Sequence, residues 1–178
     1  MAQTLSSHAI APAAVLRGEG AWSEALPRIR ALCSRPLLLG RSTSTSRLRH
    51  HLKADLSAAG LAPASAELRF DCCERDLTHL RLEAQPCDAV IAAGGGKVLD
   101  AGKLLAHRLS LPCITVPLSA ATCAGWTALS NIYSPEGAFE SDVSLNRCPD
   151  LLVFDHTLVR QAPPRTLASG VADALAKW

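Results

Sequence analysis

The strongest constraint on the fold is the segment 88–109, where an apolar run leads directly into three glycines and a lysine and then into a helical pattern. Residues 88–93 read DAVIAA and predict a short buried strand. In VLDAGKLLAHRL, which follows Gly94, Gly95, Gly96 and Lys97, apolar residues recur at helical spacing. A buried strand joined through glycines to a helix is typical of an α/β domain with a parallel sheet.

Other segments of the chain repeat this alternation of strand and helix. Strands are predicted at 35–40, 66–70, 112–116 and 151–154, and helices at 47–60 and 76–84. The polar, turn-rich stretch 131–148 predicts a hairpin on the edge of the sheet. Pro163 and Pro164 open a predicted helix over 165–178, because proline suits the first helical turn. The fold class is therefore α/β, with a mostly parallel sheet covered on both faces.

The glycines and Lys97 have a physical use beyond the turn itself. Glycine lets the backbone approach a pyrophosphate, and the first N–H groups of the following helix point at its oxygens. Lys97 adds a positive charge. The pattern is neither a Walker sequence nor GxGxxG, so a tight structural turn remains the alternative. Asp100 and Lys103 lie three residues apart on one helical face, and this spacing alone predicts an ordinary solvated ion pair.

Composition argues against several classes of partner. The formal net charge is +2, aromatic residues make up 4%, and basic residues cluster only within 47–53, so nucleic acid is not an expected partner. No run approaches the roughly 18 apolar residues of a membrane span, and the first residues do not read as a secretory signal. We therefore expect a cytoplasmic protein without a membrane partner. The seven cysteines lack CxxC spacing, which favours reduced thiols.

Two long stretches resemble the iron-containing alcohol dehydrogenase family, which includes glycerol dehydrogenase. They read GGGKVLDAGKLLAHRLSLPCITVPLSAATCAGWTALSNIYSPEG and PDLLVFDHTLVRQAPPRTLASGVADALAKW. The resemblance implies a Rossmann-like nucleotide-binding α/β domain and a C-terminal helical domain, with the cofactor and a divalent metal in the cleft between them. The implied activity is hydride transfer between NAD or NADP and a polyol or a 2-hydroxy or 2-oxo acid.

The resemblance also assigns cofactor residues. Gly94, Gly95, Gly96 and Lys97 fall where the family holds the cofactor pyrophosphate. Thr127, Leu129 and Tyr133 fall where it contacts the nicotinamide side. For Leu129 and Tyr133, packing in the core is the alternative interpretation.

A metal ligand follows from the same resemblance. Asp173, in GVADALAKW, matches the family's first metal-binding carboxylate, and the metal would be zinc or iron. A catalytic zinc site takes about three protein ligands, and the two histidines of the family pattern would lie beyond Trp178. The six histidines of this chain form no HxxxH or HExxH pair and are interpreted as surface or core residues.

Two positions depart from the glycerol dehydrogenase pattern. Cys123 replaces an aspartate that would hold a polyol, so TCAGWT looks more like the branch that acts on 2-oxo acids, whose carboxylate an aspartate would repel. Cys123 is therefore the candidate substrate residue. After the first predicted strand the chain reads Gly40-Arg41-Ser42, where NAD-preferring members tend to carry an acid. Arg41 can bind a 2′-phosphate and therefore favours NADP. The alternative interpretation is that Arg41 is a solvated loop residue.

The expected organisation is a dinucleotide-binding domain over 1–160 and the first helix of the helical metal-binding domain over 161–178. Val171, Ala174, Leu175 and Trp178 form an apolar stripe, which predicts a missing C-terminal half or a homo-oligomer, unless the helix docks on its own sheet. We expect little or no turnover from this chain alone. The alternatives are a stand-alone nucleotide-binding module without catalysis and a lyase of the dehydroquinate synthase type. The QAPPR and ASGVADALAKW segments favour the dehydrogenase branch.

Overall fold

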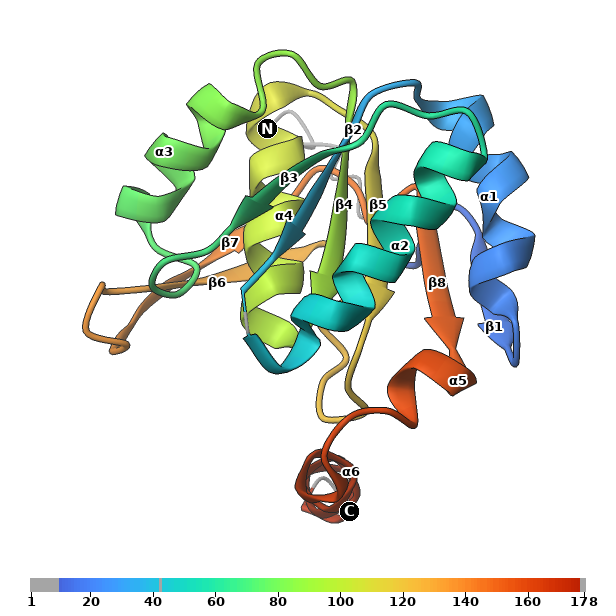
Figure 1. Cartoon of the computed structure of the whole chain (residues 1–178). Helices are drawn as coiled ribbons and strands as arrows, with labels where there is room; N and C mark the ends of the chain where they lie inside the picture. Colours follow the sequence, from blue (N-terminus) through green and yellow to red (C-terminus); the bar gives the residue numbers. More distant parts are fainter. Residues whose placement is uncertain (1–9, 42, 177–178) are drawn as a thin grey trace, which may run out of the picture.

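The computed structural model describes residues 10–41 and 43–176, and its centre is a parallel sheet (Figure 1). Within these ranges the sheet has six strands in the order β1-β8-β5-β4-β2-β3. All neighbouring pairs are parallel. The strands are β1 (Val15–Gly18), β2 (Pro36–Gly40), β3 (Ala64–Glu67), β4 (Ala89–Gly94), β5 (Cys113–Pro117) and β8 (Leu151–Asp155). The predicted α/β class is confirmed.

Helices cover both faces of this sheet (Figure 1). One face packs against α1 (Ala21–Leu32) and α2 (Ser46–Ala58), and the other against α3 (Glu74–Glu83) and α4 (Gly96–Leu109). Successive side chains of a strand point to opposite faces. In β2, Leu38 therefore joins the α1 and α2 core, whereas Leu37 and Leu39 join the α3 and α4 core. Burial on both faces explains why these strands read as continuous apolar runs.

The topology creates a crevice between β2 and β4, which are neighbours in the sheet. The chain leaves β2 into α2 on one face and leaves β4 into α4 on the opposite face. Connections that diverge in this way open a space beyond the carboxyl ends of the two strands, where ligands of open α/β sheets bind. Gly40 ends β2 and Gly94 ends β4, so the glycine-rich segment lies at this edge.

The third strand begins and ends earlier than predicted. It spans Ala64–Glu67 instead of 66–70. The backbone N–H groups of Arg69 and Phe70 both donate to Asp76 Oδ2, at 2.8 Å each. Because these two amides donate to an α3 side chain, they are not available for hydrogen bonds to a neighbouring strand, and Arg69 and Phe70 lie outside the sheet.

The hairpin is present but does not lie on the sheet edge. Strands β6 (Leu129–Tyr133) and β7 (Phe139–Ser144) form a separate antiparallel sheet. Ile132 packs in the core cluster that contains α4, and the Tyr133 N–H donates to the Cys72 carbonyl at 2.8 Å. The hairpin therefore lies on the side of the sheet that α3 and α4 cover. Its apolar residues pack in the core there and not beside an edge strand.

The N-terminal elements β1 and α1 were not predicted. β1 is a short edge strand beside β8, and α1 contains Pro27, which weakens its helical pattern. The start of α1 is fixed by tertiary contact, because the Trp22 N–H donates to Asp155 Oδ2 at 2.9 Å. Asp155 also caps α5 (His156–Val159) by accepting the Thr157 and Leu158 amides.

The last described helix, α6 (Pro164–Leu175), lies beyond the carboxyl edge of the sheet (Figure 1). Pro163 and Pro164 open it as predicted, but it ends at Leu175 and Ala176 is its C-cap. Gly170 brings it close to the loop after β5, since an added Cβ there would lie 2.2 Å from the Ala120 oxygen. Its apolar side chains are exposed, and Trp178 lies outside the described residues. In the described part of the chain, no helix is long and apolar enough to cross a membrane.

Candidate dinucleotide-binding site

The glycine segment between β4 and α4 has a different constraint at each position. An added Cβ at Gly94 would lie 2.8 Å from the Val98 side chain, so packing requires glycine there. At Gly96 an added Cβ would lie 3.2 Å from Thr122 Oγ1. At Gly95, the N-cap of α4, it would meet nothing within 4 Å, and the φ of −84° suits any residue. The fold therefore does not require glycine at position 95, and the missing side chain leaves open space beside the start of α4.

The N-terminus of α4 opens at this position. Val98 and Leu99 donate their amides to the Gly95 carbonyl, at 3.0 and 3.1 Å. The earlier amides of an α-helix have no acceptor inside the helix, and the helix dipole adds a partial positive charge. A phosphate group fits this arrangement, because the amides supply donors and Gly95 leaves room for close approach.

Two adjoining hollows meet at Gly96 and Lys97. The first, of about 280 Å³, has Arg41 and Gly94 among its lining residues, and the second, of about 380 Å³, has Cys123. Together they bring the predicted cofactor and substrate residues to one continuous surface. These residues are Arg41, Gly94, Gly95, Gly96, Lys97, Cys123, Thr127, Leu129 and Tyr133. Leu129 is 38% exposed, and Tyr133 lines the second hollow while also packing partly against the core.

Lys97 and Arg41 share a carboxylate that the sequence analysis did not identify. Arg41 Nη1 forms an ion pair with Asp71 Oδ1, and Lys97 Nζ with Asp71 Oδ2. Lys97 Nζ also lies over the Tyr133 ring, 4.9 Å from its centroid. Two cations around one buried carboxylate leave one net positive charge beside the glycine segment.

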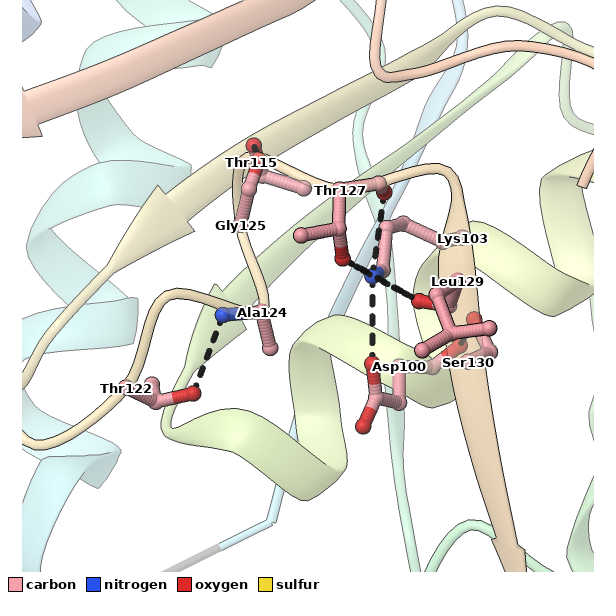
Figure 2. A network of polar contacts seen from close by, with 9 residues as sticks. All are labelled: Asp100, Lys103, Thr115, Thr122, Ala124, Gly125, Thr127, Leu129 and Ser130. Atoms are coloured by element: carbon pink, nitrogen blue, oxygen red, sulfur yellow. Dashed lines mark hydrogen bonds and ion pairs between the residues drawn. The ribbon is translucent and has the colours of Figure 1, made fainter. Parts of the chain in front are cut away.

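Lys103 organises the loop that forms the second hollow (Figure 2). Its side chain is 1% exposed, and Nζ forms an ion pair with Asp100 Oδ1 at 3.1 Å. Nζ also donates to the Thr127 carbonyl at 3.2 Å, to Thr127 Oγ1 at 3.1 Å and to the Leu129 carbonyl. The predicted solvated ion pair is therefore wrong: the β5–β6 loop covers the pair and supplies it with backbone acceptors.

The Asp100 carboxylate is buried within the same network. Burial raises its pKa, and the opposing effects of Lys103 and the Asn131 amide do not fully compensate. Ser130 Oγ donates to the Asp100 carbonyl at 3.0 Å. A second side chain holds the other end of the loop, since Thr115 Oγ1 donates to the Gly125 carbonyl at 2.9 Å. Buried polar bonds thus fix the loop that presents Thr127.

The cysteines all carry free thiols, as predicted, and they differ in exposure. Cys123 is exposed, whereas the other thiols are buried. Burial raises the pKa of Cys33, Cys72 and Cys113 to about 12. Since the thiolate is the reactive form, these three thiols react slowly near neutral pH.

We expect iodoacetamide near neutral pH to alkylate Cys123 well before any other cysteine of the folded chain. Exposure gives the reagent access to Cys123, while burial shields the other cysteines from it. Peptide mass spectrometry after brief labelling measures this selectivity, with Cys123→Ser as the control. Fast labelling of a buried cysteine in the folded Cys123→Ser variant would contradict the expectation.

Asp173 stands apart from the two hollows. It is exposed on α6 and lines neither of them. Gly170, three residues earlier, faces the loop after β5, whereas Lys177 lies outside the described residues. Among the residues described, no group of three or more histidines, cysteines or acids could hold a metal ion. Asp173 alone therefore does not make a metal site.

A third hollow of about 460 Å³ was not expected from the sequence. It lies between the start of α2, the loop after β5 and the start of α6, and Gly95 also lines it. Its basic side chains are Arg47, His51 and Arg165. The hollow therefore extends the glycine surface toward α6, and its lining is positively charged.

The residues that sequence reasoning missed are mainly those defined by tertiary contact. Asp71 carried one usable signal, because an acid soon after a strand of a parallel sheet lies at the carboxyl edge with the other loops. The burial of Asp100 and Lys103 had none, since nothing in their spacing indicates that the β5–β6 loop folds over α4. Among the histidines that the structure describes, none belongs to a group of three or more metal-ligating side chains, and His79 Nε2, for example, lies 2.8 Å from Glu83 Oε1. His8 lies outside the described residues.

Known proteins share both the sequence pattern and the fold. The sequence profile of the iron-containing alcohol dehydrogenase family matches residues 12–156. An uncharacterized oxidoreductase of Synechocystis sp., slr1167, is 46% identical over 179 residues, which cover 99% of this chain and 46% of that protein. Hydroxycarboxylate dehydrogenase A of Escherichia coli is 38% identical over 111 residues, or 62% of this chain and 31% of that protein.

A solved structure agrees with the fold. The crystal structure of a probable glycerol dehydrogenase from Sinorhizobium meliloti 1021 has a TM-score of 0.84 and 26% identity, and the match covers 98% of this chain and 47% of that one. This chain thus spans about half the length of the relatives it matches. The extent of the family match and the identity to slr1167 lead to one conclusion: the chain belongs to the iron-containing alcohol dehydrogenase family.

Proposed function

We propose that this chain is the dinucleotide-binding part of an oxidoreductase that transfers hydride between NAD(P) and a polyol or a 2-hydroxy or 2-oxo acid. The observation that carries the proposal is Gly95: it caps α4 at the carboxyl edge of the sheet, and its missing side chain faces open space beside two hollows. Membership in a dehydrogenase family gives the general class of reaction.

The residues of this chain would bind and orient the cofactor. The α4 amides and Lys97 would hold the pyrophosphate beside Gly95 and Gly96. The nicotinamide would lie in the second hollow, between Thr127, Leu129 and Tyr133. When bound, nicotinamide accepts or delivers the hydride. The protein then positions the ring, and the Lys103 contacts hold Thr127 and Leu129 in place for that task.

Cys123 is the proposed substrate residue, because it lines the same hollow as Thr127 and Leu129 and is exposed. A thiol near neutral pH does not repel the carboxylate of a 2-hydroxy or 2-oxo acid, whereas an aspartate would. The matched relatives include a hydroxycarboxylate dehydrogenase and several glycerol dehydrogenases, so they support both substrate classes and the choice between them rests on Cys123.

A divalent metal would need ligands beyond those described. Asp173 remains a proposed single ligand, and it lies on α6 at the carboxyl edge of the sheet. The described residues form no group of three or more histidines, cysteines or acids that could hold a metal ion, so we assign no step to a metal.

We expect the purified chain to bind NADH or NADPH saturably and to change the fluorescence of Trp126, which lies in the loop between Cys123 and Thr127. Trp22 is buried in the α1 core and serves as an internal reference. A Trp126→Phe variant should lose the optical signal but retain binding by calorimetry. If the wild-type chain shows no heat and no fluorescence change with either dinucleotide, the proposal is wrong.

A further inference from the structure

The Asp71 carboxylate lies behind the candidate site and does not line either hollow at Lys97. Its side chain is 7% exposed, whereas the Arg41 and Lys97 side chains are 40% and 41% exposed. Both cations line the first hollow. Asp71 therefore contacts Arg41 and Lys97 from the buried side, whereas an anion bound in the hollow would contact them from the solvent side.

The surroundings keep Asp71 away from water. It follows β3 in the loop that leads to α3, and the turn of the β6–β7 hairpin approaches it. An added Cβ at Gly137 in that turn would lie 3.4 Å from Asp71 Oδ2. Because Asp71 is buried, salt screens its interaction with Arg41 and Lys97 less than it would screen an ion pair between fully exposed side chains.

We propose that Asp71 is a specificity-determining residue for the dinucleotide, acting through Arg41 and Lys97. This inference rests on the proposed function. A carboxylate held by both cations competes with a phosphate for their charge and directs their donors inward. The competition matters most at Arg41, where the extra 2′-phosphate of NADPH would need a free guanidinium. Asp71 thus opposes the preference for NADPH that Arg41 alone would produce.

The same geometry predicts that the fold tolerates the loss of this carboxylate. Removing one partner of a buried pair is costly when the remaining charge stays buried. Here the remaining charges are Arg41 and Lys97, which are partly exposed and can be solvated or can bind an anion. An Asp71→Asn variant keeps the size of the side chain, removes its charge and replaces one acceptor oxygen by an amide NH2 group.

We expect Asp71→Asn to lower the ratio of Kd for NADPH to Kd for NADH by about tenfold, which is the order expected for one charge close to a phosphate. Isothermal calorimetry at fixed ionic strength measures both constants without turnover. Glu24→Gln, on the exposed start of α1, removes the same charge far from the site and should leave the ratio unchanged. In an Arg41→Ala background, Asp71→Asn should shift the ratio much less, because the interaction with the 2′-phosphate is already lost.

Three results would overturn this role. In the first, the ratio of the two Kd values stays constant in Asp71→Asn although both dinucleotides bind. In the second, both affinities fall together with the melting temperature, as for a purely structural residue. In the third, Asp71→Asn shifts the ratio just as much in the Arg41→Ala background. If the wild-type chain binds neither dinucleotide, the proposed function fails and this inference fails with it.

Discussion

Replacing Gly95 by valine should abolish dinucleotide binding and leave the fold intact. An added Cβ at Gly95 meets no protein atom within 4 Å, and its φ of −84° is open to any residue. The branched side chain would therefore occupy the hollow and not the core. It would exclude the pyrophosphate from the α4 amides, and we expect Kd to rise by at least about a hundredfold, since several charge-assisted hydrogen bonds are lost together.

The matched control for this variant is Gly95→Thr. Valine is a poor N-cap, and its use costs about 1 kcal/mol of helix stability, whereas threonine has the same shape and caps well. If crowding is the cause, both variants lose binding and only valine lowers the melting temperature slightly. A second comparison is Gly94→Val, which would clash with Val98 and should destabilise the fold itself. Undiminished affinity in Gly95→Val and Gly95→Thr would place the pyrophosphate elsewhere.

Replacing Lys103 by methionine should destabilise the chain by about 3–5 kcal/mol, the usual cost of leaving one member of a buried pair without its partner. Asp100 would remain buried, and the Thr127 and Leu129 carbonyls would lose their common donor. Urea unfolding followed by circular dichroism measures the difference. Lys53→Met makes the same substitution at a half-buried position on α2 and should change the free energy of unfolding by about 0.5 kcal/mol or less.

The effect of Lys103→Met should depend on pH. Burial already raises the pKa of Asp100, and removal of Lys103 raises it further. A folded-state pKa above the unfolded value stabilises the fold at low pH, and that stabilisation is lost as pH rises through the folded pKa. The variant should therefore be less destabilised at about pH 5 than at about pH 8. Adding Asp100→Asn should recover much of the loss at the higher pH, and equal destabilisation of single and double variants would contradict this explanation.

Local sequence was sufficient for the elements that surround the glycine segment. The apolar run before Gly94 predicted the strand that the structure shows as β4, and the helical spacing after it predicted α4. Strand and helix propensities agree with the tertiary fold here, since β4 is buried on both faces and α4 packs against the sheet on one side and β6 on another. Arg41 and the glycine segment share one edge because the carboxyl ends of parallel strands meet there, whereas Thr127, Leu129 and Tyr133 come from the β5–β6 loop and β6.

Elements that depend on distant partners were harder to predict. β1 is a four-residue edge strand that exists because it pairs with β8, more than a hundred residues away in the chain. The hairpin was predicted as a hairpin, but its location follows from the match between its apolar face and the α4 side of the core. Local periodicity contains no information on either pairing.

What the sequence determined by itself is the class of fold, the glycine turn and the set of candidate residues that line the two hollows beside that turn. These follow from spacing and from the conformational freedom of glycine, which act within a few residues. Only the tertiary structure decided which charged side chains of the site are buried and which of them form ion pairs. It buried Asp100 with Lys103 under the β5–β6 loop, and it placed Asp71 between Arg41 and Lys97. The physical reason is that the strength of a charge depends on its burial and on its neighbours, and both are set by segments that meet only when the chain folds.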